Sequence, residues 1–262
     1  MSQNRQPRHL TAEQEPFLIA RSLATRYSHG YLMESHCHNW HQLLSAATGA
    51  MTVLGDRAAW MAPPGRAVLI PAGVRHSIRM WGEVAMRSLY FPPEYPAAAL
   101  RIRECRVFSI TPLLRELILR AIELSALDSR AGAEARLMSV LMDELESAPA
   151  SPLALPLPSD SRALAAAKRV LNTPDNAWRL KPLARQCGAG ARTLERLFRR
   201  ETGLGFGIWR QKARLLESLR VLAQGESVTN AAFEVGYSSV SAYIAAFKRT
   251  FGCTPGVMVG SR

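Results

Sequence analysis

The last third of the chain contains one short pattern twice, and the two copies lie about fifty residues apart. Each copy has a small residue in an apolar segment, a glycine four residues later, and then a second amphipathic segment. In the first copy Ala184 allows two helices to approach closely, and Gly188 permits the tight turn between them. Ala232 and Gly236 hold the same places in the second copy. The repeat therefore predicts two units, each a short helix packed across a second helix.

The positive charge of the chain is concentrated in the same region. The 262 residues carry a formal net charge of +12, to which residues 151–262 contribute +10 and residues 1–150 contribute +2. A basic domain beside a nearly neutral one is typical of a polyanion-binding module joined to a second module. Together with the paired helical units, this charge distribution predicts sequence-specific binding to double-stranded DNA.

The cysteine pattern and the apolar runs exclude several other classes of protein. No two cysteines form a CxxC pair, so neither a zinc ribbon nor a disulfide framework is indicated at Cys37, Cys105, Cys187 and Cys253. The first residues are polar, and no stretch approaches the roughly twenty apolar residues of a membrane span. We therefore expect a cytoplasmic protein without a membrane partner.

The rhythm of apolar residues divides the chain into five segments. Short apolar runs broken by glycine and proline predict β-strands in the first part, and helical spacing follows after Pro92-Pro93. Four prolines then mark a semi-extended linker. The expected division is a flexible arm at 1–16, a β-barrel at 17–92, a helical segment at 93–147, the linker at 148–160 and an all-helical domain at 161–262.

The helical segment 93–147 contains two amphipathic helices. Thr111 is placed to cap the first of them, with Pro112 at its first position. Their apolar faces either pack on the β-domain of the same chain or meet a second subunit. We expect residues 111–146 to form a homodimer contact.

The second helix of the first unit carries a polar face suited to DNA. Arg192, Glu195 and Arg196 share one side of this helix. Arginine recognises guanine with two hydrogen bonds, and glutamate accepts one from cytosine. The alternative for Glu195 is an ion pair with Arg199 one turn later. Arg199 and Arg200 are candidates for phosphate contacts.

The second unit offers fewer directional groups. Ser239 is a suitable cap for its second helix. The outward face is expected to carry Val240 and Ser241, together with Ile244 and Ala245, so this unit should discriminate bases less. Lys248 and Arg249 are candidates for phosphate contacts. A long helix from Phe206 to Leu222 should join the units, with one side formed by Ile208, Leu215, Leu216, Leu219 and Leu222.

This C-terminal part resembles the DNA-binding domain of the AraC family of bacterial transcription regulators over residues 178–255. The residues that carry the resemblance include Leu183-Ala184, Arg192-Thr193-Leu194, Arg196-Leu197-Phe198, Glu201-Thr202-Gly203, Trp209-Arg210, Arg214-Leu215-Leu216, Val235-Gly236-Tyr237 and Phe251-Gly252-Cys253-Thr254-Pro255. The resemblance implies two helix-turn-helix subdomains bridged by one long helix, which read successive major-groove segments. Many members have an arginine where Ala245 stands, which again implies weaker base contacts by the second unit.

A histidine motif marks the first part of the chain. The spacing HxHxxxQ, followed by PxGxxH, resembles the two motifs of the cupin barrel. In metal-binding cupins the corresponding side chains converge on one ion, which implies a site at His36, His38, Gln42 and His76. Alternate strand positions would place His36 and His38 on one face, and imidazole suits several divalent metals. The alternative is a hydrogen-bonding pocket for an organic effector.

These features combine into an α+β protein: a cupin-like β-barrel with a helical pair, then an all-α domain with two helix-turn-helix subdomains. The expected function is transcription regulation, in which a small molecule or a divalent metal ion in the barrel alters DNA binding. RNA polymerase is a further candidate partner. A metal-dependent cupin enzyme is the rival interpretation, and a nucleoid-type DNA-binding protein is the third.

Overall fold

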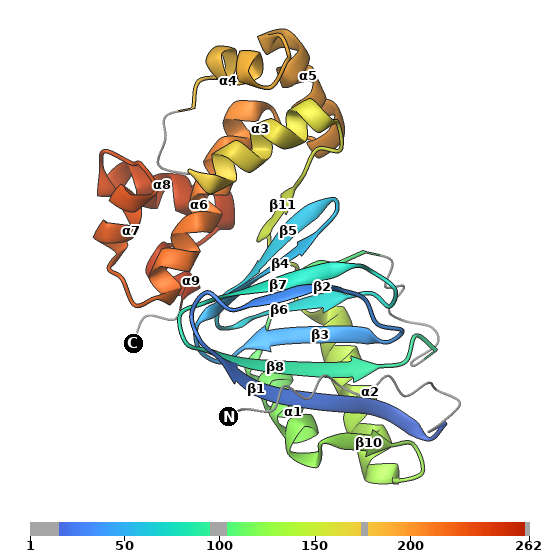
Figure 1. Ribbon diagram of the computed structural model, residues 1–262. Helices are drawn as coiled ribbons and strands as arrows, with labels where there is room; N and C mark the ends of the chain where they lie inside the picture. The colour runs from blue at the N-terminus through green and yellow to red at the C-terminus, as the bar shows by residue number, and fades with distance from the viewer. Residues whose placement is uncertain (1–15, 95–103, 174–177, 260–262) are drawn as a thin grey trace.

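The structure, a computed structural model, describes residues 16–94, 104–173 and 178–259, and it separates into a β-sheet module and a helical module (Figure 1). The expected flexible arm falls almost wholly outside these residues, as does part of the segment expected at 93–147. The expected α+β class, with an antiparallel sheet domain followed by a helical domain, is confirmed.

Two antiparallel sheets form the β-sheet module. The six-stranded sheet has the order β10 (Ala126–Asp128), β1 (Leu18–Tyr27), β8 (Val84–Phe91), β3 (His41–Ala46), β6 (Arg66–Ile70) and β9 (Arg106–Ser109). The five-stranded sheet has the order β11 (Ala154–Pro156), β5 (Ala58–Ala62), β4 (Ala50–Gly55), β7 (His76–Trp81) and β2 (Leu32–His36).

Side chains alternate across the six-stranded sheet and so serve two cores. On β3, Leu44 joins the inner core between the sheets, whereas Leu43 belongs to an outer core beneath two helices. On β8, Met86 faces inward and Leu89 faces outward in the same way. This alternation decides which polar residues of these strands reach the interior.

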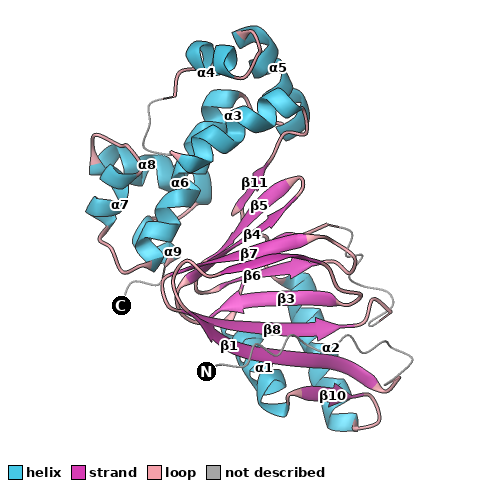
Figure 2. Cartoon of the chain, viewed as in Figure 1, coloured by secondary structure: helices cyan, strands magenta, loops and turns pink. Residues whose placement is uncertain are grey.

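The helices α1 (Pro112–Leu124) and α2 (Gly132–Ser147) cover the outer face of the six-stranded sheet (Figure 2). Thr111 caps α1 as expected, because its hydroxyl accepts from the Leu114 amide at 3.1 Å. The buried faces of α1 and α2 pack on the β-sheet module of the same chain. This packing was one of the two alternatives for these helices, the other being contact with a second subunit. Leu113 and Val140 stay 51% and 43% exposed, so these helices also carry apolar surface outside the core.

The segment expected as a semi-extended linker is also a structural part of both modules. Its residues Ala154–Pro156 form β11 and pair with β5, and Leu153, Leu155 and Leu157 are buried. The indole Nε1 of Trp209 donates to the Pro156 carbonyl at 2.6 Å. The strand was not expected, and it has a simple cause: the leucines alternate with the two-residue period of a strand, and an edge strand tolerates proline.

The helical module holds both predicted units around one long helix. The elements are α3 (Ser161–Asn172), α4 (Leu180–Gln186), α5 (Ala191–Thr202), α6 (Phe206–Ala223), α7 (Val228–Glu234), α8 (Val240–Phe251) and α9 (Pro255–Met258). Figure 1 shows α4 and α5 beyond one end of α6, whereas α7 and α8 lie beside its other part. Gly188 and Gly236 have φ values of 67° and 78°, as the tight turns require.

Two arginines of α6 fasten the units to it. Arg210 donates to the carbonyl of Trp178 just before α4, and Arg214 donates to the carbonyl of Val235 at the end of α7. The Arg214 guanidinium also lies 4.5 Å from the ring centroid of Tyr237. The expected apolar side of α6 needs one correction, because Ile208 is 63% exposed rather than buried with the leucines.

Candidate nucleic-acid interface and histidine site

The first unit presents α5 with its two arginines outward. Leu194 and Phe198 are fully buried and fix the helix, whereas Arg192 and Arg196 are exposed on the opposite side. The two arginines line a shallow surface groove beside Leu180. The N-cap of α5 is Gly190 without a side-chain hydrogen bond, so the first turn has unused backbone donors. A positive, donor-rich helix start is suited to an anion.

Glu195 was expected to contact a base, but the structure gives its carboxylate two other partners. One oxygen accepts from Arg199 Nε at 3.0 Å, which is the alternative ion pair. The other accepts from the Phe206 amide at 3.2 Å and so caps the start of α6. The side chain is 31% exposed. The structure thus gives Glu195 the role of joining α5 to the next helix, and its contact with a base stays a prediction.

The two remaining arginines of α5 extend from its last turn. Arg199 and Arg200 are 72% and 61% exposed, which leaves them accessible to a phosphate. Arg200 pairs with Glu201 at 2.6 Å. The second carboxylate oxygen of Glu201 accepts from the amides of Ser159 and Asp160, and these bonds hold the pKa of Glu201 at about 2. The charged carboxylate thereby ties α5 to the start of α3.

The second unit has a less polar outer face than the first. Ser239 caps α8 as expected, because its hydroxyl accepts from the Ala242 amide at 3.4 Å. Val240, expected to face DNA, is half-buried and packs against the core, as does Ile244. The cause is the helical period, which places both on the edge of the stripe that holds Tyr243 and Phe247. The expected residues of this unit that are exposed are Ser239, Ser241, Ala245, Lys248 and Arg249.

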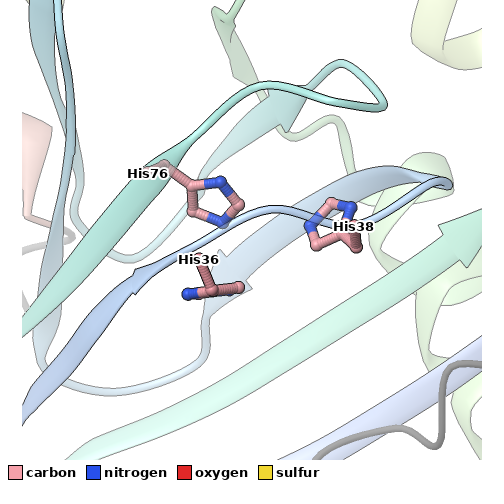
Figure 3. Close-up of side chains that lie close together, drawn as sticks. All are labelled: His36, His38 and His76. Carbon is pink, nitrogen blue, oxygen red and sulfur yellow. The ribbon is translucent and has the colours of Figure 1, made fainter.

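Three of the four expected residues of the histidine motif come together at one end of the sheet module. One ring nitrogen each from His36, His38 and His76 lies within 4.8 Å of the others (Figure 3). His36 is the last residue of β2 and pairs directly with His76, the first residue of β7. His38 lies beyond the strand, so the loop, and not strand alternation as expected, brings it to His36.

The hydrogen bonds of these rings leave the Nε2 atom of His76 available, whereas the Nε2 atom of His38 contacts Gln42 Oε1. The Nδ1 atoms of His36 and His76 each contact a backbone carbonyl, which can only accept, so these Nδ1 atoms carry the protons. The Nε2 of His76 is buried with no hydrogen-bond partner among the described residues. Burial lowers the pKa of His76 to about 4, so its Nε2 keeps a free lone pair at neutral pH. An orphaned acceptor beside two further imidazoles fits a metal ion.

Gln42, the fourth expected residue, belongs to a hydrogen-bond network beside the histidines. Its Oε1 lies 3.1 Å from His38 Nε2, and its Nε2 donates to Ser88 Oγ at 3.0 Å and to Tyr90 Oη at 2.9 Å. Ser88 and Tyr90 were not identified from the sequence. Their spacing of two on a predicted strand was the only signal available, because nothing in sequence joins them to the histidine motif.

A contact between the modules was also not foreseen. The Cζ atom of Arg220 on α6 lies 5.1 Å from the ring centroid of Trp81, the last residue of β7. The same guanidinium pairs with Glu217 on α6 and with Glu234 on α7, the latter at 2.9 Å. The two modules therefore lie close together at this point. The sequence alone does not indicate this contact, because Trp81 and Arg220 are far apart in the chain.

The turn after β7 confirms how tightly the modules meet. A Cβ atom at Gly82 would lie 2.7 Å from the backbone oxygen of Ala223, at the end of α6. The Gly82 amide donates to Nδ1 of His29 at 3.1 Å, and the Gln224 amide group lies 3.3 Å from the same nitrogen. The position therefore requires glycine for space as well as for its φ of 71°.

Comparison with known proteins covers both modules. The family model described as an AraC-like ligand binding domain matches residues 19–141, and that of a helix-turn-helix domain matches residues 183–259. The HTH-type transcriptional regulator NimR of Escherichia coli is 35% identical over 221 residues, which cover 84% of this chain and 80% of NimR. The regulator RipA of Corynebacterium glutamicum is 35% identical over 100 residues, 38% of this chain and 30% of RipA.

Among solved structures, the fold is similar to that of ToxT from Vibrio cholerae, crystallised with an unsaturated fatty acid. The TM-score is 0.39 at 12% identity, over 93% of this chain and 95% of ToxT. Within residues 16–94, 104–173 and 178–259, none of the helices combines the length and the hydropathy that crossing a membrane requires.

The capping role of Glu195 gives a first prediction. Glu195→Ala should lower the free energy of unfolding by about 1 kcal/mol, because the Phe206 amide loses its acceptor. Glu195→Gln keeps an acceptor oxygen and should lose less. Urea unfolding measures both, and selection of bound DNA from a random pool measures base preference. A base preference that changes at one position in Glu195→Gln would restore the base-reading role.

Proposed function

Because the chain belongs to the AraC family of transcription regulators, we propose that its paired units read one DNA site under control of a metal-dependent effector. A single arrangement carries the proposal. The helical module holds exposed basic helices, and the β-sheet module of the same chain holds three convergent histidines. The strand β7 of the β-sheet module contacts α6, the helix that joins the two basic units.

In this proposal α5 supplies most of the sequence discrimination. Arg192 and Arg196 contact guanine edges in the major groove, and Arg199 and Arg200 contact the flanking phosphates. In the second unit α8 positions the protein through Ser241 and the phosphate contacts of its last turn, Lys248 and Arg249. The exposure of these side chains supports the assignment. The capping of α8 by Ser239 orients that helix.

The histidines form the second half of the proposal. His36, His38 and His76 would bind a divalent cation, for which the Nε2 of His38 would exchange its contact with Gln42 Oε1. Zinc, nickel, copper and iron(II) all accept imidazole ligands. A bound ion would join β2, β7 and the loop between β2 and β3, and three protein ligands leave a position for an exogenous molecule. The protons held on Nδ1 by backbone carbonyls support this ligand set.

The remaining partners follow from the regulatory role. We infer a homodimer through α1 and α2, supported by the exposed Leu113 and Val140. RNA polymerase is a further expected partner, because a DNA-bound regulator acts on transcription. A cytoplasmic location agrees with a DNA target and with four cysteines that are free of disulfides. The rival enzyme interpretation gains no support, since the relatives are named as transcription regulators.

The unequal faces of the two units generate a prediction for DNA binding. Arg192→Ala and Arg196→Ala should each weaken binding by about 1–3 kcal/mol and relax base choice at the contacted position. Ser241→Ala should cost less, because its hydroxyl offers fewer bonds. Footprinting and titration at fixed salt measure the losses. Equal losses at both units, or a wild-type protein that protects no promoter DNA, would contradict the proposal.

The histidine cluster predicts metal-dependent stability. Zinc in excess over its dissociation constant by about a hundredfold should stabilise the fold by about 2.7 kcal/mol. His76→Gln should abolish most of this gain, whereas His41→Gln should keep it, because His41 contacts the Ala72 amide and Phe91 instead. Thermal unfolding with zinc and with a chelator gives the comparison. A gain that survives His76→Gln would place the ion elsewhere.

The contact between the modules predicts how metal loading reaches DNA. In Trp81→Ala the Arg220 guanidinium loses its ring partner, so the DNA affinities with and without zinc should become nearly equal. Phe17→Ala is the matched control, because it removes another arginine–aromatic contact, to Arg130, far from α6 in the sequence. Coupling of this kind is about 5–150-fold in binding. Unchanged coupling in Trp81→Ala would exclude this route.

A further inference from the structure

Residues 157–160 form a strap between the β-sheet module and the helical module, because they follow β11 and lead into α3 (Figure 1). The sheet end of the strap is fixed: the Leu157 amide donates to the Arg57 carbonyl at 2.7 Å, and the Leu157 side chain is buried. The helix end is fixed as well, since the Asp160 carboxylate caps α3 by accepting from the Arg162 amide at 3.0 Å. Both ends of the strap are thus held in place.

The carboxylate of Glu201, in the last turn of α5, holds the strap between these ends. Its Oε2 atom accepts from the Ser159 amide at 2.9 Å, from the Ser159 hydroxyl at 3.1 Å and from the Asp160 amide at 2.9 Å. The Glu201 side chain is only 13% exposed. These bonds, first among them the one from the Asp160 amide, keep its pKa near 2, so it is charged at neutral pH. Hydrogen bonds to an ionised acceptor are stronger than those to a neutral one.

The two carboxylates of α5 anchor this helix to different parts of the protein. Glu195 accepts from the Phe206 amide and joins the helix to α6, whereas Glu201 joins it to the strap and so to β11. The ring of Phe198 packs on the rings of Phe206 and Trp209, which again joins α5 to α6. The two carboxylates are six residues apart, about 9 Å along the helix. Anchors at two such points fix the tilt of α5, and loss of one lets the helix turn about the other.

The tilt of α5 matters most for base contacts. A two-pronged hydrogen bond from arginine to guanine needs correct distances and angles for both donors at once. A phosphate contact depends mainly on charge and tolerates more displacement. A change in tilt therefore removes the base contacts expected of Arg192 and Arg196 before it removes the phosphate contacts.

Glu201 also restrains the attraction of α5 for DNA of any sequence. The Arg200 side chain is 61% exposed, and its guanidinium pairs with Glu201 Oε1 at 2.6 Å. A negative charge beside a phosphate-binding arginine reduces the binding energy that is independent of sequence. Glu201 is thus placed to favour discrimination between DNA sequences over binding strength.

We propose that Glu201 is a positioning residue for base recognition: by holding the strap, its carboxylate sets the tilt at which α5 enters the major groove. The inference rests on the proposed function for the reading of bases by Arg192 and Arg196. It goes beyond that function because it makes the angle of the first unit depend on the strand β11 of the β-sheet module.

Titration of the full-length protein with two DNA duplexes tests the proposal. One is the duplex that the wild-type protein selects from a random pool, and the other is a scrambled duplex of the same composition. Glu201→Ala should reduce the ratio of the two affinities about tenfold, the loss expected when a two-pronged base contact fails, while the affinity for the scrambled duplex rises. Glu201→Gln keeps an oxygen that accepts from the strap amides, so it should restore most of the ratio.

Glu226→Ala is the matched control. It also removes one negative charge from the helical module, but the Glu226 carboxylate accepts from the Asn230 side chain and does not hold the strap. The ratio of the two affinities should therefore stay at the wild-type value in this variant. Circular dichroism and thermal unfolding establish that each variant is folded at the temperature of the titration.

Second substitutions separate positioning from a general loss of structure. In the Glu201→Ala background, Arg196→Ala should cost little further, because its base contact is already lost. Lys248→Ala, on α8, should cost as much as it does in the wild type. If Glu201→Ala does not fold, Ser159→Ala takes its place. It removes one of the three bonds to the strap and should lower the ratio by less, in the same direction.

Two sets of results would contradict these expectations, and they differ in what they overturn. The inference alone is overturned if a wild type with a clear sequence preference keeps its ratio in Glu201→Ala. A ratio that Glu201→Gln does not restore, or an equal loss of the Arg196 and Lys248 contributions, also overturns it. A wild-type protein that binds both duplexes equally overturns the proposed function and the inference with it.

Discussion

The helix α6 is the constraint on which the other elements depend. Its buried side chains Trp209, Leu215 and Leu219 connect the core of the helical module to the leucines of β11. The burial of each of these side chains stabilises the fold by about 1.5–3 kcal/mol. Together they hold α6 from several sides. Because both DNA-reading units and the sheet module contact this one helix, no unit can change its angle without a change in the packing of α6.

Carboxylates fix this arrangement where backbone groups would otherwise lack partners. Glu195 satisfies an amide at the start of α6, and Glu201 satisfies two amides before α3. Both belong to α5, which also carries the exposed side chains of Arg192, Arg196, Arg199 and Arg200. One helix therefore has its acidic groups turned to its neighbours and its basic groups turned to solvent. This separation gives α5 a net positive outer surface, although its sequence contains both signs of charge.

The sequence predicted those parts of the fold that depend on local spacing. The alanine-to-glycine interval of the two units and the cap at Thr111 each act within a few residues. The meeting of His76 with His36 and His38 was implied by the family resemblance. The role of Glu195 could not be predicted, because its second partner belongs to the next helix. The burial of Leu153, Leu155 and Leu157 depends on β5 and α6, which lie far away in sequence. The positions of Gln42 and Tyr90 side by side depend on the register of β3 and β8.

The strand β7 links the two sites of the protein directly. It begins at His76 in the histidine cluster and ends at Trp81 beneath Arg220, a span of about 17 Å for a strand of this length. It pairs with β4 over its whole length. Under the proposed function, a ligand that draws His76 toward His36 and His38 would therefore act on a strand that its neighbour holds at every residue. The displacement would be passed to α6, where Arg220 also pairs with Glu234 of the second DNA-reading unit.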